Sequence, residues 1–176
     1  MARILCVPFF VWSLFAIPQD STARWFSVLI FIVIMISDGV DGAIARKRGL
    51  ITNLGKLLDP IADKALLGGA LVALAILGEF SWWITIVILV RELGITAYRL
   101  VVVQREVVAA SSGGKLKTIL QSVLIGSLAS PLAFVFVPWY SYVESTLTIV
   151  VLLITVYTGL QYMIAAGKAR RQRINS

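Results

Sequence analysis

The sequence predicts an all-α integral membrane protein with six transmembrane helices and with both its N- and C-termini on the cytoplasmic side. Three observations lead to this fold class. Hydrophobic residues make up 59% of the 176 positions and the mean hydropathy is +0.93, far above the values of soluble globular domains. Apolar stretches of roughly 20 residues, the length that crosses a ~30 Å hydrocarbon core, recur along the chain. Basic residues gather in alternate connections between these stretches.

The apolar segments follow one another as one domain over residues 1–176, with no internal repeat. The first is short, because the 14 residues from Ile4 to Ile17 span only about 21 Å at 1.5 Å per residue. Tryptophans at the ends of several segments are typical of an aromatic belt at the membrane interface. In chain order the predicted spans are Ala2–Pro18, Trp25–Ala45, Pro60–Leu77, Trp82–Val103, Thr118–Val137 and Tyr142–Ala166.

Charge gives the predicted orientation. Lysines and arginines cluster after the second, fourth and sixth segments, whereas Arg24 is the only basic residue in the opposite connections. Basic connections favour the cytoplasmic side. The net charge of +7 is therefore mostly a one-sided belt, suited to anionic membrane lipid and phosphorylated substrates. Nucleic-acid binding is excluded as an interpretation, because the sequence contains no soluble basic domain.

Two features of composition restrict the possible chemistry. The chain has no histidine, so neither a histidine base nor a histidine metal ligand is available. Its single cysteine, Cys6, lies in the first apolar segment and has no partner for a disulfide within the chain.

Four of the nine carboxylates fall between the second and third segments. Asp38 and Asp41 are three residues apart and share one face of a helix, still at membrane depth. Asp59 and Asp63 are four apart, and Asp59 before Pro60 predicts an N-cap with proline at the first helical position. The short connection predicts antiparallel packing, with the two pairs facing each other.

Four carboxylates in a low-dielectric site repel one another unless a cation neutralises them. Ligands that are all oxygen suit a hard ion such as Mg²⁺, Mn²⁺ or Ca²⁺, and four aspartates can hold two ions that neutralise a diphosphate. The alternative is a set of interfacial ion pairs with nearby basic residues. Small residues beside the aspartates favour a bound ligand that approaches the backbone; these are Gly42, Ala45 and Gly55.

The spacing of these residues resembles a known family. The pattern Asp38-x2-Asp41-Gly42-x2-Ala45-Arg46-x8-Gly55-x3-Asp59-x3-Asp63 matches the signature of the CDP-alcohol phosphotransferases at all eight fixed positions. The resemblance implies an enzyme with six spans and an active site that opens to the cytoplasmic side of a bacterial inner membrane. It also implies a homodimer.

The resemblance further implies roles for the motif. The family transfers a phosphatidyl or similar group from a CDP-linked donor to an alcohol and releases CMP. By that analogy two divalent ions, Mg²⁺ or Mn²⁺, are held by Asp38, Asp41, Asp59 and Asp63. The cytidine nucleotide would be surrounded by Asp38, Gly42, Ala45, Arg46 and Gly55. Asp63 would be the base that takes the proton of the attacking hydroxyl, which agrees with the absence of histidine.

The fourth and fifth segments carry a possible second anion site. Arg91 lies nine residues after Trp82, near the middle of the membrane, where a charge costs at least ~2.5–3.5 kcal/mol and should face a polar cavity. With three further cations, Arg99, Lys115 and Lys117, it would suit an alcohol that is itself a phosphate ester. The alternative makes Arg91 and Glu92 a structural ion pair and the lysines cytoplasmic anchors.

Two segments, Arg91–Arg99 and Gly114–Gln121, resemble the branch of the family that contains the bacterial phosphatidylglycerophosphate synthases. That resemblance implies CDP-diacylglycerol as donor and glycerol 3-phosphate as acceptor. One departure is visible: of the branch's Asn-x2-Thr-x2-Arg-x4-Pro run, only Arg3 and Pro8 are present. The Asn, the Thr and the branch's N-terminal amphipathic helix would precede Met1.

Two kinds of alternative stay open at this point. The same chemistry could use another acceptor, namely inositol phosphate, serine or phosphatidylglycerol. A protein of a different class, a divalent-cation transporter, would also place four aspartates in a membrane, although it would not need Gly42, Ala45 and Gly55 beside them.

Overall fold

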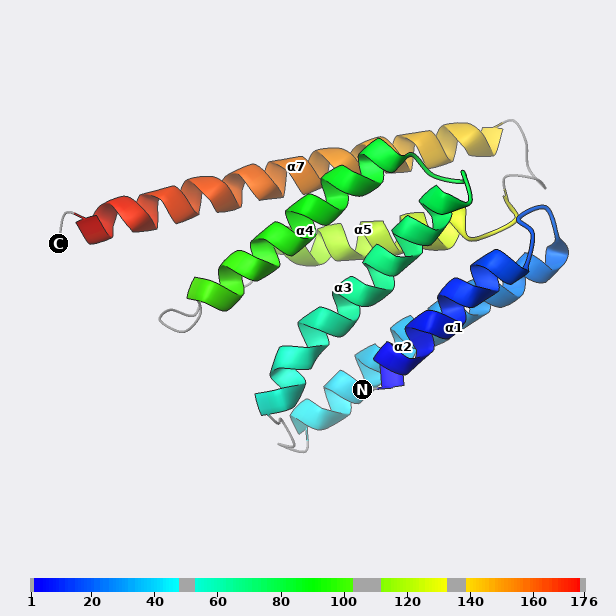
Figure 1. Cartoon of the computed structure of the whole chain (residues 1–176), viewed down its shortest axis with the longest axis horizontal. Helices are drawn as coiled ribbons and strands as arrows, with labels where there is room; N and C mark the ends of the chain where they lie inside the picture. Colours follow the sequence, from blue (N-terminus) through cyan, green and yellow to red (C-terminus); the bar gives the residue numbers. More distant parts are fainter. Residues whose placement is uncertain (1, 48–52, 103–111, 133–138, 175–176) are drawn as a thin grey trace.

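The chain folds into helices throughout the part described by its computed structural model, residues 2–47, 53–102, 112–132 and 139–174 (Figure 1). Side chains are described at 6–37, 40, 61–97, 116–132 and 139–164. No strand occurs within these ranges, so the predicted all-α class is confirmed. The elements are α1 (Ala2–Ala16), the short 3₁₀ helix η1 (Thr22–Arg24), α2 (Trp25–Lys47), α3 (Asn53–Ile76), α4 (Trp82–Val102), α5 (Ser112–Leu128) and α7 (Trp139–Ile174).

Helix α3 lies at the centre of the bundle, in contact with α1, α4 and α5. Helix α7 packs along α4 and α5 on one side, and α2 packs beside α1 on the other (Figure 1). Their shared core is made of large aliphatic and aromatic side chains, with tilted rings of Phe10 and Phe31 5.2 Å apart between α1 and α2. The fully buried members include Phe10, Leu66, Leu71, Leu74, Ile88, Leu124, Ile125 and Val151.

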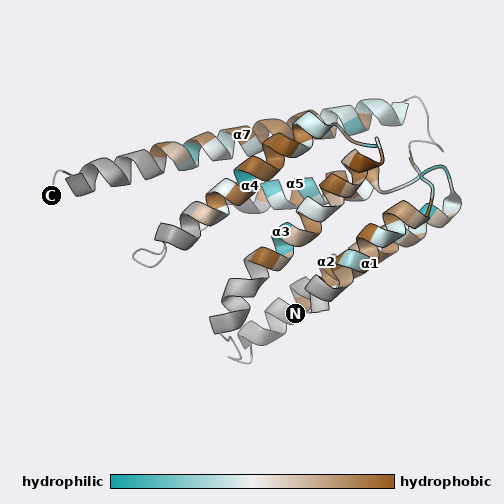
Figure 2. Cartoon of the chain, in the orientation of Figure 1, coloured by the Kyte–Doolittle hydropathy of each residue, from teal (hydrophilic) through white to brown (hydrophobic). Residues whose placement is uncertain are grey.

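The outside of the bundle is also apolar. Trp83, Tyr142 and Met163 are 80%, 73% and 70% exposed, which is the pattern of a surface covered by lipid rather than water. Hydrophobic residues predominate along the helices, and hydrophilic positions interrupt α3, α4 and α5 (Figure 2). Within the described residues, Trp139–Ile164 alone is both long and apolar enough to cross a membrane by itself. The other five spans remain predictions.

The start of α3 corrects one expectation. The helix begins at Asn53, so Asp59 and Pro60 lie inside it and Asp59 is not its N-cap. Residues 54–58 include three leucines and a lysine, which favour helix, and they extend it by more than a turn. Proline has no N–H, so at position 60 it leaves the carbonyl of residue 56 without its usual helical donor.

Two other helices differ in extent from the predicted spans. The fifth span was placed at Thr118–Val137, but α5 runs from Ser112 to Leu128. Pro131 explains the early end, because a proline disfavours helical backbone in the residue before it. Helix α7 begins three residues before the predicted Tyr142 and continues to Ile174, through the basic residues that follow the apolar segment.

A buried arginine joins the ends of several helices. The guanidinium of Arg24, in η1, donates to the carbonyls of Leu14 at 2.6 Å and Ala129 at 3.2 Å. It thereby satisfies carbonyls near the ends of α1 and α5 that have no helical donor. Helix α3 ends nearby at Ile76, and the φ of +76° at Gly78 permits a tight turn in which the Glu79 N–H donates to the Leu74 carbonyl at 2.9 Å.

Candidate active site

The residues of the aspartate motif occupy the facing ends of two consecutive helices. Asp38, Asp41, Gly42, Ala45 and Arg46 lie in the last turns of α2. Gly55, Asp59 and Asp63 lie in the first three turns of α3. Only five residues, 48–52, separate these helices, so the two halves of the motif are near each other (Figure 1).

Asp63 is the member of this motif whose side chain the structure describes. It is partly buried and lines a cavity of about 20 Å³, room for roughly one water molecule. The side chains of the other motif residues lie outside the described set. Within that set no group of three acidic residues is close enough to hold a metal ion, and the predicted metal ligands therefore remain a prediction. The cavity wall also includes Lys64, Glu92, Thr118 and Gln121.

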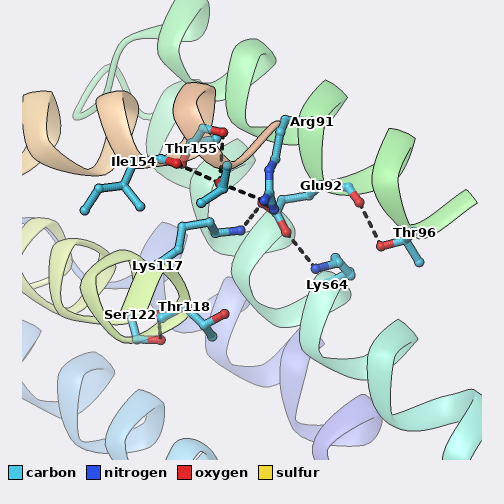
Figure 3. Close-up of polar contacts among 10 residues, drawn as sticks. Lys64, Arg91, Glu92, Thr96, Lys117, Thr118, Ser122, Ile154 and Thr155 are labelled. Atoms are coloured by element: carbon cyan, nitrogen blue, oxygen red, sulfur yellow. Dashed lines mark hydrogen bonds and ion pairs between the residues drawn. The ribbon is translucent and has the colours of Figure 1, made fainter. Parts of the chain in front are cut away.

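Beside Asp63, three cations converge on the carboxylate of Glu92 (Figure 3). Glu92 Oε2 accepts from Lys64 Nζ at 2.6 Å, and Oε1 accepts from Arg91 Nη1 at 2.8 Å and from Lys117 Nζ. These side chains come from α3, α4 and α5, so one acidic group links the three helices that meet at the centre. Glu92 and Lys117 are 8% and 3% exposed. This is a desolvated cluster, in which charge pairing is strong.

Arg91 also reaches the fourth helix of this cluster. Its Nη2 donates to Thr158 Oγ1 of α7 at 2.8 Å, while its Nε–H is buried and has no partner among the described residues. Gly159 leaves room for the arginine: a Cβ at that position would meet Arg91 Cγ at 3.3 Å. The guanidinium is thus fixed on two sides, and its Nε–H remains available among the described contacts.

The structure brings together two of the four cations predicted for the anion site, Arg91 and Lys117. It also forms the Arg91–Glu92 ion pair that the structural alternative predicted. The same alternative treated Lys117 as a cytoplasmic anchor, and its burial against Glu92 contradicts that part. Arg99 lies in the last turn of α4 and Lys115 in the first turn of α5, with side chains outside the described residues.

Sequence reasoning did not assign Lys64, Glu92 or Gln121 to the anion site. Gln121 is 1% exposed and its Oε1 has no hydrogen-bond partner among the described residues, beside the cavity that Asp63 lines. The sequence did contain a reason to assign Lys64 to the site, because this residue directly follows Asp63. A signal for Glu92 was also present, since a carboxylate inside an apolar span needs cations from neighbouring helices.

Similarity to known proteins identifies the family of this chain. The family model for CDP-alcohol phosphatidyltransferase matches residues 1–166. A probable phosphatidylglycerophosphate synthase of Mycobacterium tuberculosis is 42% identical over 94% of this chain and 78% of its own length. A CDP-diacylglycerol–glycerol-3-phosphate 3-phosphatidyltransferase of Bacillus subtilis is 38% identical, covering 73% of this chain and 72% of its own length.

A protein of the same name from Shigella flexneri is 35% identical over 93% of this chain and 90% of its own length. The resemblance inferred from the eight motif positions is therefore confirmed by matches that extend along nearly the whole chain. Members of this family are membrane enzymes of phospholipid synthesis, which fits the apolar exterior of the bundle. The chain belongs to the CDP-alcohol phosphatidyltransferase family.

Proposed function

We propose that this protein transfers a phosphatidyl group from CDP-diacylglycerol to a hydroxyl of glycerol 3-phosphate, giving phosphatidylglycerol phosphate and CMP. The observation that carries the proposal is the complete eight-residue aspartate motif within a chain that matches its family model over residues 1–166. The names of the relatives from Bacillus subtilis and Shigella flexneri support both substrates.

The donor site is the aspartate motif. Its carboxylates fit a hard divalent ion, because they are all-oxygen ligands on two helix ends that a five-residue connection keeps close. One or two ions, Mg²⁺ or Mn²⁺, would neutralise the donor diphosphate when bound. The ligands would be Asp38, Asp41, Asp59 and Asp63, and the nucleotide would lie against Asp38, Gly42, Ala45, Arg46 and Gly55.

Asp63 is the proposed general base. Its carboxylate takes the proton of the acceptor hydroxyl as the hydroxyl oxygen forms a bond to the phosphorus of the phosphatidyl group. The bond from that phosphorus to the CMP oxygen breaks, and CMP leaves. A carboxylate suits this role in a chain without histidine, and Asp63 borders the described cavity.

The acceptor phosphate would bind at the cations beside that cavity. Lys117 supplies a buried donor there and Arg91 a half-buried one, and Arg99 and Lys115 are proposed to complete the site from the ends of α4 and α5. The cavity itself is too small for glycerol 3-phosphate, so the acceptor would extend from it toward the motif aspartates. This arrangement places the phosphate on cations while a hydroxyl reaches Asp63.

The membrane arrangement is part of the same proposal. All six helices span a bacterial inner membrane, both termini and the active site face the cytoplasm, and the enzyme is a homodimer. The one-sided distribution of lysine and arginine supports this orientation. The apolar exterior of α1, α2 and α4 supports lipid contact for these three helices.

A CMP-release assay on the purified protein tests the proposal. With CDP-diacylglycerol and Mg²⁺ or Mn²⁺, CMP should appear with glycerol 3-phosphate and remain near background with glycerol, inositol phosphate, serine or phosphatidylglycerol. CMP release with one of the other acceptors instead would reassign the substrate. Uptake of Mn²⁺ into proteoliposomes, without CMP release for any acceptor, would overturn the enzymatic assignment.

A further inference from the structure

We infer that Glu92 is a positioning residue for the acceptor: it holds the cations of the anion site in place before glycerol 3-phosphate arrives. The inference rests on the proposed function and adds a residue that is neither a metal ligand nor a direct phosphate ligand. It starts from the three ion pairs that a single buried carboxylate makes with Lys64, Arg91 and Lys117.

The charges of this cluster do not balance. Three cations and one carboxylate leave a net charge of +2 on these four residues. A clamp between helices needs only one cation per carboxylate, and surplus buried charge is costly. A phosphate monoester carries about −1.5 to −2 at neutral pH, close to the charge that would neutralise the cluster. An anion site requires this surplus of positive charge, whereas a purely structural ion pair does not.

Donors also remain available after Glu92 is satisfied. Each ammonium has three N–H donors and gives one to Glu92 in the contacts described here, and the Nε–H of Arg91 has no partner among the described residues. Lys64 is 26% exposed, so its ammonium is the accessible member. Asp63, the proposed base, precedes Lys64 in the chain and lines the same cavity.

Two opposite effects follow from removing the Glu92 charge. The cluster would gain positive charge, which would favour a phosphate by Coulomb attraction. Lys117, however, is 3% exposed and would lose its counter-ion, and a buried charge without a partner is far more costly than one screened by solvent. Lys117 would therefore turn away from this position, and phosphate binding would have to bring it back. The loss of preorganisation outweighs the added charge, so acceptor binding should weaken.

The test is steady-state kinetics of Glu92→Gln in the CMP-release assay. The KM for glycerol 3-phosphate should rise about 10- to 150-fold, the range that corresponds to one charge-assisted hydrogen bond. The KM for CDP-diacylglycerol should change less than twofold. Glu92→Asp, which keeps the charge, should recover part of the loss. Should Glu92→Gln fail to fold, the Glu92→Asp variant tests the inference, and we expect it to raise the KM for glycerol 3-phosphate but not the KM for CDP-diacylglycerol.

A double-mutant cycle separates positioning from a structural role. If Glu92 acts through the cations, Glu92→Gln combined with Lys117→Met should be no worse toward glycerol 3-phosphate than the more defective single variant. Full additivity, an unchanged or lower acceptor KM, or equal losses for both substrates in parallel with melting temperature would overturn the inference. Wild-type protein that uses glycerol as readily as its phosphate would instead overturn the proposed function.

Discussion

Arg24 and Glu79 form a buried ion pair at the opposite end of the bundle from the aspartate motif, with Nη2 and Oε2 2.6 Å apart. Their side chains are 1% and 11% exposed. Burial lowers the pKa of the Arg24 guanidinium and raises the pKa of the Glu79 carboxyl, and the attraction between the two opposes both changes. Each charge therefore depends on the other for its compensation.

Removing the arginine should be strongly destabilising. Arg24→Met leaves the Glu79 charge buried without a partner and frees the carbonyls of Leu14 and Ala129, at an expected cost of roughly 3–5 kcal/mol. Unfolding in detergent, followed by circular dichroism, measures the loss. Asp20→Asn, an exposed change in the same connection, is the control and should stay within about 0.5 kcal/mol of wild type.

The same variant should show a pH dependence that extends further above pH 4.5 than that of the wild type. Without Arg24 only burial acts on Glu79, so its pKa in the folded state lies above the ordinary 4.5. The folded state then binds more protons than the unfolded state in the window between the two values, and stability falls as the pH rises through that window. The double variant Arg24→Met/Glu79→Gln should lack this slope. A flat pH profile in Arg24→Met would contradict the assignment.

The turn after α3 depends on a residue without a side chain. Gly78 has φ of +76°, a region that costs other residues about 1–2 kcal/mol, so Gly78→Ala should destabilise the protein by about that amount. No atom lies within 4 Å of the added Cβ, so the effect isolates the backbone. Gly94→Ala is the matched control, because Gly94 is helical with equally open surroundings and alanine favours a helix.

Metal dependence provides a prediction for the donor site. Asp38→Asn should abolish CMP release and weaken binding of Mn²⁺, and EDTA should inactivate the wild-type protein reversibly. Asp63→Asn should lower kcat by about 10²–10⁴-fold, the usual contribution of a general base. Normal turnover of Asp38→Asn in metal-free buffer, or an unchanged kcat in Asp63→Asn, would remove the corresponding assignment.

Gly159 offers a way to disturb Arg91 without changing its charge. A Cβ there would approach Arg91 Cγ to 3.3 Å, closer than comfortable packing, so Gly159→Ala should shift the guanidinium by a few tenths of an ångström. We expect the KM for glycerol 3-phosphate to rise severalfold and the KM for the donor to stay constant. Gly94→Ala again serves as control. Equal effects of the two substitutions on acceptor KM would show that Arg91 does not require this space.

Much of this architecture follows from local sequence. The length of the apolar segment predicted the end of α4 to within one residue. The first residues of α2 and α4 were also predicted, because a tryptophan marks the start of each helix. Two of the errors occurred at prolines. Pro60 was taken as the beginning of a helix that in fact starts at Asn53. Pro131 was read as part of a continuous span, although it explains the early end of α5. A proline restricts the backbone both before and after it, and the amino-acid sequence alone does not show which of these two sides is helical.

The candidate site, like the fold, could be predicted only in part from local sequence. Fixed spacing along two adjacent helices identified the aspartate motif, since residues three and four apart share a face. The cluster around Glu92 joins residues that are 25 and 28 positions away, on α5 and α3, and no short-range pattern encodes that meeting. Which cation reaches the carboxylate depends on how the helices pack. Sequence reasoning therefore found Arg91 and Lys117, but it paired Glu92 with Arg91 alone.

Helix α7 is an unbroken rod of 36 residues from Trp139 to Ile174. At 1.5 Å per residue it measures about 54 Å, against ~30 Å for a hydrocarbon core, so its basic end would hold a fused reporter clear of lipid headgroups. A fluorescent or phosphatase reporter attached after Ser176 would reveal on which face of the bilayer this rod emerges. Because α4 and α5 pack along α7, that single sidedness measurement also orients the two helices that carry Glu92 and Lys117.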